Sequence, residues 1–239
     1  MSTRELIFDG KEKKIYSTED PDVVLIHYND VTTAYGGIKR AIIKDKGICN
    51  NHISALAFQV LAKEGVENHF IRLENDREQL CRRIEIIPLQ VVARNRLAGS
   101  TARMLGVANG TVIPNTVYEL RYNNDRLKDP MINDTHVLAL GIVSSDELKR
   151  IYSLTARANE VLKEFFHKAG MELVDAKLEC GRTSDGKIIL YDEISPDNCR
   201  IWDEQTGEVL DKDRFRHDMS DVTVSYQKVM ERLDKAFEQ

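Results

Sequence analysis

The most informative feature of this 239-residue sequence is a predicted hairpin whose strands carry charged side chains. Residues 173–180 and 187–194 have the composition of strands, and the Asp185-Gly186 pair between them is typical of a two-residue hairpin loop. With that loop, Glu179 lies opposite Asp192 on one face of the sheet. Opposed Cβ atoms are about 4.5–5.5 Å apart, so two like charges at these positions destabilise the sheet.

Asp175 and Lys177 share the face of the two opposed acids, because side chains alternate along a strand. The residues between them point to a predicted core; they are Val174, Ala176, Leu178 and Cys180. A dication on the acidic face would relieve its repulsion, and Mg²⁺ in proteins usually takes one or two carboxylates together with phosphate groups. The alternative is a solvated hairpin face on which Lys177 neutralises one acid.

Three other segments carry basic residues that could bind anions. Arg200, Arg214 and Arg216 follow the hairpin closely, and the planar guanidinium group matches carboxylate and phosphate. Near the N-terminus, a turn at residues 9–14 would hold Lys11 and Lys13 over a phosphate group. This turn lacks the spacing of a Walker A loop, and a lysine-rich surface turn is the alternative.

The third segment runs from Arg94 to Ser100, where a predicted strand ends and a short helix begins. The Ser100 hydroxyl is expected to cap this helix, and free N–H groups beside Arg94 and Arg96 are suited to a monophosphate. The alternative is simple helix capping with arginines on the surface.

The elements that must position these residues change in class along the chain. Strand-like segments at 13–17, 23–29 and 83–93 surround one predicted helix at 48–62, which ends at Gly65. In the second half, a capping box of Ser144 and Glu147 opens a long predicted helix, which ends at Gly170. Another helix is predicted at 221–237. We expect an α+β protein with a β-rich part over 1–90 and an α+β part over 91–239.

Composition excludes several functional classes. Thirty-four Lys and Arg residues against 39 Asp and Glu residues give a net charge of −5, which does not attract nucleic acid in general. No apolar run approaches the ~18 residues of a membrane span, and the N-terminus has no secretory pattern, so a cytoplasmic location is expected. The four cysteines are widely spaced and are expected to be free buried thiols; they are Cys49, Cys81, Cys180 and Cys199.

Taken together, these motifs resemble the SAICAR synthetase (phosphoribosylaminoimidazole-succinocarboxamide synthase) family, in its short single-function bacterial form. The segments that carry the resemblance extend over nearly the whole chain; they are 10–16, 91–95, 98–100, 129–131, 174–181, 192–203 and 211–216. The resemblance implies an antiparallel β-rich lobe over an α+β domain, with nucleotide between them. It also implies an ATP-dependent ligase that joins carboxyaminoimidazole ribonucleotide (CAIR) to L-aspartate, giving SAICAR, ADP and phosphate in purine biosynthesis.

The resemblance also implies a role for each candidate residue. Lys11 and Lys13 would cover the ATP phosphates, and backbone near Ile86 would meet adenine. The resemblance implies that four residues act in catalysis and also bind ATP; they are Lys13, Lys177, Glu179 and Asp192. The implied Mg²⁺ ligands are Glu179, Asp192 and Asp129. The residues implied for the ribonucleotide are Arg94, Ser100, Arg200 and Arg216. A homodimer is also implied.

Two segments depart from the family pattern as we understand it. Cys180 stands where Phe is common, and it points away from Glu179, so we expect altered packing and intact chemistry. The loop at 35–39 also differs, which bears on contacts near the reacting carboxylate or aspartate. Two other functions stay open: a small-molecule kinase, which would release a phosphorylated product without using aspartate, and a non-catalytic nucleotide sensor. Lys177, Glu179 and Asp192 together disfavour the sensor.

Overall fold

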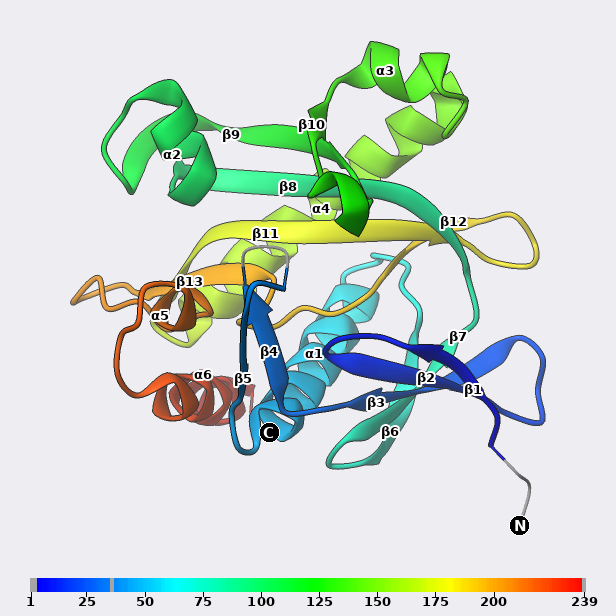
Figure 1. Cartoon of the computed structure of the whole chain (residues 1–239), viewed down its shortest axis with the longest axis horizontal. Coiled ribbons are helices and arrows are strands. Elements are labelled where there is room, and N and C mark those ends of the chain that lie inside the picture. Colours follow the sequence, from blue (N-terminus) through cyan, green and yellow to red (C-terminus); the bar gives the residue numbers. More distant parts are fainter. Residues whose placement is uncertain (1–3, 35–36, 238–239) are drawn as a thin grey trace.

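Two antiparallel sheets form the framework of the computed structural model, which describes residues 4–34 and 37–237 (Figure 1). The five-stranded sheet has the order β1 (Leu6–Asp9), β2 (Lys13–Ser17), β3 (Val23–Tyr28), β7 (Glu78–Arg82), β6 (Phe70–Asn75). The six-stranded sheet has the order β10 (Met131–Ile132), β9 (Thr111–Tyr122), β8 (Glu85–Leu97), β11 (Met171–Arg182), β12 (Ile188–Tyr191), and β13 (Cys199–Asp203) also pairs with β11. This mixed architecture confirms the predicted α+β class.

A separate hairpin joins β4 (Val31–Ala34) to β5 (Lys39–Ile42). Two long helices pack on the sheets, α1 (Lys46–Lys63) and α4 (Ser145–Lys168), and a third, α6 (Val222–Phe237), packs against these two helices. The short helical segments are α2 (Gly99–Leu105), a 3-10 turn (Asp125–Leu127), α3 (Asp134–Ala139) and α5 (Asp213–Arg216). None of the helices among the described residues combines the length and apolar character needed to cross a membrane.

Local sequence signals explain where the long helices begin and end. The Ser144 hydroxyl accepts a hydrogen bond from the Glu147 backbone N–H (3.2 Å), and Glu147 Oε2 accepts one from the Ser144 N–H (2.8 Å), which confirms the predicted capping box of α4. The predicted helix at 48–62 lies within α1, and Gly65 follows it with a φ of 76° that favours glycine.

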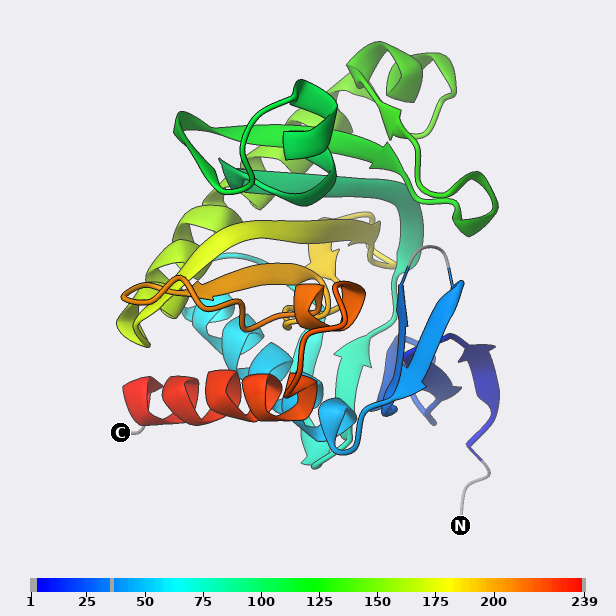
Figure 2. The same ribbon diagram turned by 60° about the vertical axis from the view of Figure 1, so that its left-hand side comes forward.

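One large core joins both halves of the sequence. It contains Phe58 of α1, Leu162 of α4, Leu178 of β11 and Leu233 of α6, each at most 1% exposed. The division at residue 90 stays a prediction; β8 runs through that position, and α1 from the first segment packs within the core of the second. Figure 2 shows α1 and α6 on the same side of the large sheet.

The predicted pairing of the acidic hairpin is wrong by one residue. Arg182 pairs with Ile188 and Glu179 pairs with Tyr191. The loop is longer than predicted because residues 183–187 form their own turn, in which the Thr183 N–H donates to the Lys187 carbonyl (2.9 Å). An odd-numbered loop shifts the register by one position, so Tyr191, not Asp192, lies opposite Glu179.

Candidate active site

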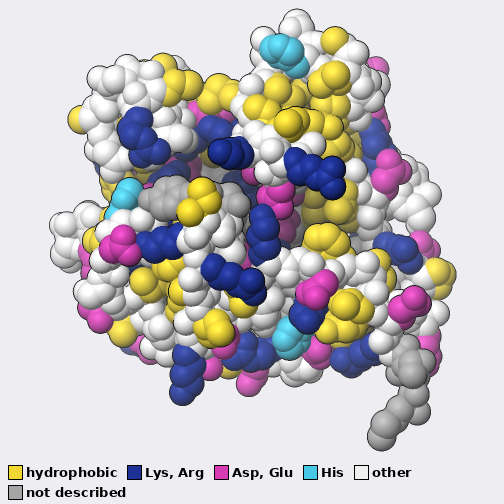
Figure 3. Space-filling model, in the orientation of Figure 1, with side chains coloured by type: hydrophobic (Ala, Val, Ile, Leu, Met, Phe, Trp, Pro, Cys, Tyr) yellow, Lys and Arg dark blue, Asp and Glu magenta, His cyan; other side chains and the backbone are white. Residues whose placement is uncertain are grey.

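A cleft between the two sheets contains most of the charged residues singled out from the sequence. Its cavity measures about 600 Å³, and β1, β2, β8, β11 and the segments after β12 and β13 supply its walls. The space-filling view shows acidic side chains gathered at its centre with basic side chains around them (Figure 3). The predicted residues that line it are Lys11, Lys13, Arg94, Ser100, Asp129, Lys177, Glu179, Asp192, Arg200 and Arg216.

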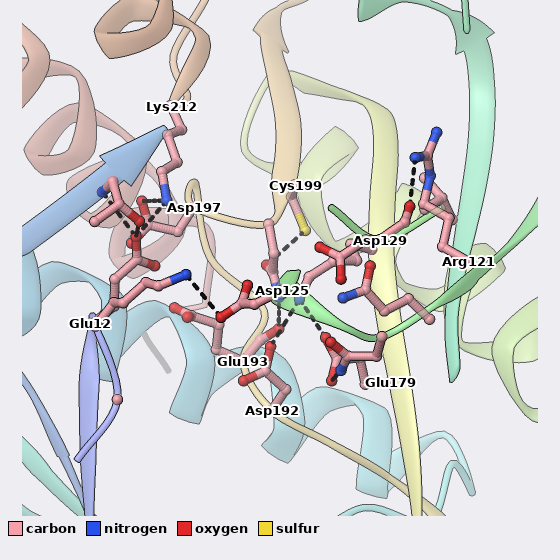
Figure 4. Close-up of a pocket in the computed structure, with 18 of the residues that line it drawn as sticks. Glu12, Arg121, Asp125, Asp129, Glu179, Asp192, Glu193, Asp197, Cys199 and Lys212 are labelled. Atoms are coloured by element: carbon pink, nitrogen blue, oxygen red, sulfur yellow. Dashed lines mark hydrogen bonds and ion pairs between the residues drawn. The ribbon is translucent and has the colours of Figure 1, made fainter. Parts of the chain in front are cut away.

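Glu179 and Asp192 approach each other despite the corrected register. Asp192 follows the last residue of β12 and has a φ of 79°, so the chain turns out of the strand at this position. The Lys177 ammonium contacts Glu179 Oε1 and lies 3.5 Å from Asp192 Oδ2. The two carboxylates therefore converge on one cation, as Figure 4 shows around the labelled acids.

Lys13 adds a second cation to this group. Its ammonium contacts Asp192 and lies 3.0 Å from Glu193 Oε1. Burial alone would raise the pKa of Asp192, but the ammonium groups of Lys13 and Lys177 outweigh it and hold that pKa below its usual range. Asp192 is therefore ionised at neutral pH. Lys11 lies further out and pairs with Asp125 across the cleft mouth (2.8 Å).

Glu179 has two neutral partners that the sequence did not indicate. The Tyr191 hydroxyl donates to Glu179 Oε2 (2.8 Å), and the Asn123 side-chain amide donates to the same oxygen (3.0 Å). Burial, and then the neighbouring carboxylates, raise the pKa of Tyr191, so its hydroxyl keeps its proton. Tyr191 could not be assigned because its place opposite Glu179 depends on the loop length.

A second cavity of about 450 Å³ adjoins the first and is mostly apolar. Its apolar walls come from β1, β2, β3 and the start of β8, and the residues are Ile7, Phe8, Ile15, Val24, Ile26, Ile84 and Ile86. Ile86, which the resemblance implied near adenine, is 56% exposed in this wall. The two cavities share Phe8, Lys13, Asn123, Glu179 and Asp192. An apolar chamber thus opens onto the charged centre.

The arginine end of the cleft is built from ion pairs. The Arg94 guanidinium is buried and binds both carboxylate oxygens of Glu119 (2.6 and 2.8 Å) and Asp175 Oδ2 (2.8 Å). Arg200 donates to Asp175 (2.8 Å) and to Asp213 (2.7 Å). Arg216 also pairs with Asp213 (2.5 Å). Shared carboxylates therefore hold all three arginines of this end in fixed positions.

Two predictions about the neighbourhood of Ser100 have different outcomes. Helix α2 begins at Gly99 with Ala98 as its cap and no side-chain capping bond, so the expected cap by Ser100 is wrong. The exposed Ser100 side chain lies on the cleft instead. Gly99 has a φ of 60° and lies against the Arg200 guanidinium, where a Cβ atom would collide with it. Glycine here allows the helix to approach Arg200.

Asp129 lies at the cleft edge, where its carboxylate accepts a hydrogen bond from the Asn124 N–H (2.8 Å). Of the loop at 35–39 that departs from the family pattern, residues 35 and 36 lie outside the described residues. Cys180 is 2% exposed in the large core, and all four cysteines are free and buried as predicted. The expected packing role of Cys180 therefore agrees with its position.

A second acidic group was not found from the sequence. Carboxylate oxygens of Glu12, Glu193 and Asp197 lie within 4.8 Å of one another, close enough to hold a metal ion. Each already has an ammonium partner: Lys212 lies 2.6 Å from Glu12, and Lys46 lies 2.5 Å from Asp197, while Lys13 contacts Glu193. No spacing in the sequence indicates that Glu12 meets the distant segment that carries Glu193 and Asp197.

Comparisons with known proteins place this chain in one family. The family model for SAICAR synthetase matches residues 6–233. A phosphoribosylaminoimidazole-succinocarboxamide synthase from Clostridium acetobutylicum is 51% identical, over 98% of this chain and 99% of the relative. A solved synthase of that name from Ehrlichia chaffeensis is 41% identical, with a TM-score of 0.94 over 96% of this chain and 98% of its own.

A SAICAR synthetase (Type-2) solved in complex with ADP is 40% identical, with a TM-score of 0.92 over 95% of this chain and 97% of its own. A family model over nearly the whole chain and relatives at this identity establish membership. The chain belongs to the SAICAR synthetase family.

Proposed function

We propose that this chain condenses CAIR with L-aspartate at the described cleft, with ATP as cosubstrate, and releases SAICAR, ADP and phosphate. The observation that carries this proposal is the junction of the two cavities, where Lys13, Glu179 and Asp192 line both. One chamber is apolar and suits a base, and the other ends in arginines and suits a phosphorylated substrate. Their junction is where a phosphoryl group would pass between substrates.

The nucleotide fits the apolar chamber. Its adenine would lie against the wall that includes Ile86, and its phosphates would point to the junction, near Lys13 and Lys11. The short Gly10 turn between β1 and β2 presents these lysines, and the Gly10 N–H donates to the Lys13 carbonyl (2.9 Å). A related synthetase solved with ADP supports nucleotide binding in this fold.

Mg²⁺ fits the donors at the junction. Glu179 and Asp192 are hard oxygen donors that already converge on the Lys177 ammonium, so these carboxylates accommodate positive charge between them. We therefore assign Glu179 and Asp192 as ligands, with Asp129 at the cleft edge as a further candidate. Bound Mg²⁺ would neutralise phosphate charge during transfer.

The second acidic group is a weaker metal candidate. Its three carboxylates face Lys13, Lys46 and Lys212, and Asp197 also accepts hydrogen bonds from Asn50 (2.6 Å) and Tyr226 (2.8 Å). A metal ion there would displace the buried side chains of Lys46 and Lys212 and the partly buried side chain of Lys13. We interpret this group as a structural charge network.

CAIR would occupy the arginine end. Its phosphate would lie near Ser100, Arg200 and Arg216, and its carboxylate would point to the junction. Arg94 is buried behind this surface and binds Glu119 and Asp175, so it supports Arg200 through their shared Asp175. A guanidinium group has five N–H donors, and Arg94 uses three of them on carboxylates. We propose that the other two can bind the ribonucleotide directly.

The chemistry follows from the substrate. A carboxylate is a poor electrophile because its leaving group would be oxide. Transfer of the ATP γ-phosphoryl group to a CAIR carboxylate oxygen releases ADP and gives an acyl phosphate. The aspartate amine then attacks the acyl carbon, the C–N bond forms, and phosphate leaves with the C–O electron pair and takes up the proton that the amine nitrogen loses. Lys13 and Lys177 neutralise charge on the phosphoryl oxygens and hold them in place.

ADP release measured with and without L-aspartate tests this function. With ATP, Mg²⁺ and CAIR present, we expect sustained ADP release only when aspartate is added, with SAICAR formed in equal amount. Equal ADP release without aspartate would support the kinase alternative, and no ADP release in either case would support the sensor. The homodimer implied by the resemblance and the cytoplasmic location expected from the sequence pattern stay predictions.

A further inference from the structure

The two carboxylate oxygens of Glu179 have different kinds of partner. Oε1 receives the charged Lys177 ammonium, and Oε2 receives two neutral donors, the Tyr191 hydroxyl (2.8 Å) and the Asn123 amide (3.0 Å). The Glu179 side chain is 6% exposed, so its orientation is set by these partners and not by water. The arrangement divides the carboxylate into a charged side and an anchored side.

The two neutral donors come from separate elements. Tyr191 ends β12 directly opposite Glu179 on β11, and its ring lies edge-on to His69 with centroids 6.2 Å apart. Asn123 follows β9, and its backbone N–H donates to the Pro88 carbonyl (3.1 Å). Packing fixes the first donor and a main-chain hydrogen bond fixes the second. Glu179 is therefore anchored from both sides of the junction.

Neutral anchors suit a carboxylate that must bind a cation. A hydrogen bond from a hydroxyl or amide fixes the carboxylate direction and leaves its negative charge in place, whereas an ammonium competes with a metal ion for that charge. Here Lys177 occupies the oxygen that the anchors leave accessible. A dication that replaced Lys177 would meet a carboxylate already oriented by Tyr191 and Asn123.

We propose that Tyr191 and Asn123 are positioning residues that orient Glu179 for Mg²⁺ binding. This inference rests on the proposed function, because it assumes that Glu179 is a metal ligand. The two residues also line the nucleotide chamber, so a test must separate the anchor from contact with nucleotide. Tyr191→Phe does so, because it removes the hydroxyl and keeps the ring.

The experiment measures ADP affinity by calorimetry over a series of Mg²⁺ concentrations and in EDTA. Mg²⁺ is expected to enhance ADP affinity. We expect Tyr191→Phe and Asn123→Ala each to raise the Mg²⁺ concentration that gives half of this enhancement about tenfold, as is typical when a residue that hydrogen-bonds to a metal ligand is lost. For Tyr191→Phe, ADP affinity in EDTA should stay at the wild-type value.

Tyr152→Phe is the matched control. The Tyr152 hydroxyl donates to Asp134 (2.7 Å) on the far helices α4 and α3, so this variant also removes a tyrosine–carboxylate hydrogen bond. It should leave the Mg²⁺ requirement unchanged, even where its melting temperature falls. An unchanged Mg²⁺ requirement in Tyr191→Phe would overturn the inference, whatever happens to its stability.

A double-mutant cycle separates this inference from the function on which it rests. In a Glu179→Gln background, Tyr191→Phe should cause no further change in the Mg²⁺ requirement, because the negatively charged ligand that Tyr191 orients is already lost. The same tenfold change in that background would contradict a role through Glu179. If Glu179→Gln itself left the Mg²⁺ requirement at the wild-type value, the metal assignment of Glu179 would fail first.

Discussion

At the scale of residues, the junction holds its charges in alternation. Lys177 lies between Glu179 and Asp192, and Lys13 lies between Asp192 and Glu193. Burial alone would raise the pKa of Glu193, and the nearby Asp197 adds to this effect, so the pKa of Glu193 is raised although Lys13 opposes the shift. Each charged group thus has neighbours of opposite charge, and removal of one group changes the net charge of a partly buried site.

Glu179→Gln should reduce kcat by at least about 100-fold, because the amide cannot supply the negative charge that a dication requires. The amide is close in size and can still accept from Tyr191 and Asn123, so the fold should persist. Steady-state kinetics and circular dichroism check the two parts. Wild-type turnover in a folded Glu179→Gln protein would remove Glu179 from the mechanism.

Arg94→Ala should lower the free energy of unfolding by about 3 kcal/mol, because it removes the buried cation that Glu119 and Asp175 share, although Arg121 and Arg200 stay beside these carboxylates. Arg96→Ala is the control, since the partly exposed Arg96–Glu172 pair should contribute at most about 1 kcal/mol. Urea unfolding measures both.

Where Arg94→Ala folds, we expect its KM for CAIR to rise much more than its KM for ATP. Equal changes in the two constants would show that Arg94 acts on the fold alone and not on the arginine end of the cleft.

The sequence predicts the residues whose type alone carries the chemistry. Lys177 and Glu179 alternate along one strand, and this spacing is visible without a structure. Tyr191 and Asn123 are not predictable in this way, because a tyrosine or an asparagine becomes an anchor only through its register or its distant strand. For Arg94, the residue type alone misleads: arginine suits phosphate, yet the partners of buried Arg94 are two carboxylates.

At the scale of elements, helix α4 has the clearest local signal and the hairpin the weakest. The capping box of α4 depends on residues three positions apart and forms as predicted. The hairpin depends on whether its loop has two residues or five, and Asp-Gly is compatible with both. Hydrogen bonds of Thr183 within the loop decide the matter, and these bonds exist only in the folded turn.

Glu147→Gln tests the cap. The Arg182 guanidinium, followed by the Ser144 N–H, lowers the pKa of Glu147 to about 2. A lowered carboxylate pKa stabilises the protein above the unfolded value near 4.5, and this stabilisation is lost as the pH falls toward 2. Glu147 is partly exposed, so screening limits the effect, and we expect Glu147→Gln to cost about 1 kcal/mol at pH 7.

The difference in unfolding free energy between wild type and Glu147→Gln should be constant from pH 7 to about pH 5 and should narrow as the pH falls from about 4.5 toward 2, as measured by urea unfolding. A difference that is constant over this lower range would mean that the glutamate charge contributes nothing to the cap.

At the scale of the whole molecule, buried charge links the first third of the chain to the last. Lys46 at the start of α1 binds Asp197 after β12 (2.5 Å), and both side chains are at most 2% exposed. Asp197 also accepts a hydrogen bond from Tyr226 of α6 (2.8 Å). Sequence patterns gave the class of each half, but they could not show this link, because contacts between distant segments leave no local spacing.

Lys46→Met should lower the free energy of unfolding by about 3 kcal/mol, because it removes the ammonium that lies 2.5 Å from the buried Asp197 carboxylate and leaves the Lys212 ammonium 3.6 Å away. Lys149→Met is the control, since Lys149 pairs with Asp146 on an exposed helix face (3.0 Å) and should cost less than about 1 kcal/mol. Equal losses in the two variants would contradict the role of the buried pair.

The proposed reaction requires a dication between Glu179 and Asp192 at the junction of the two chambers. A crystal structure with ADP and Mn²⁺, with anomalous scattering recorded for the metal, tests it most directly. We predict a manganese peak in contact with both carboxylates and with the ADP phosphates, and displacement of the Lys177 ammonium. A peak among Glu12, Glu193 and Asp197, with none at Glu179, would contradict it.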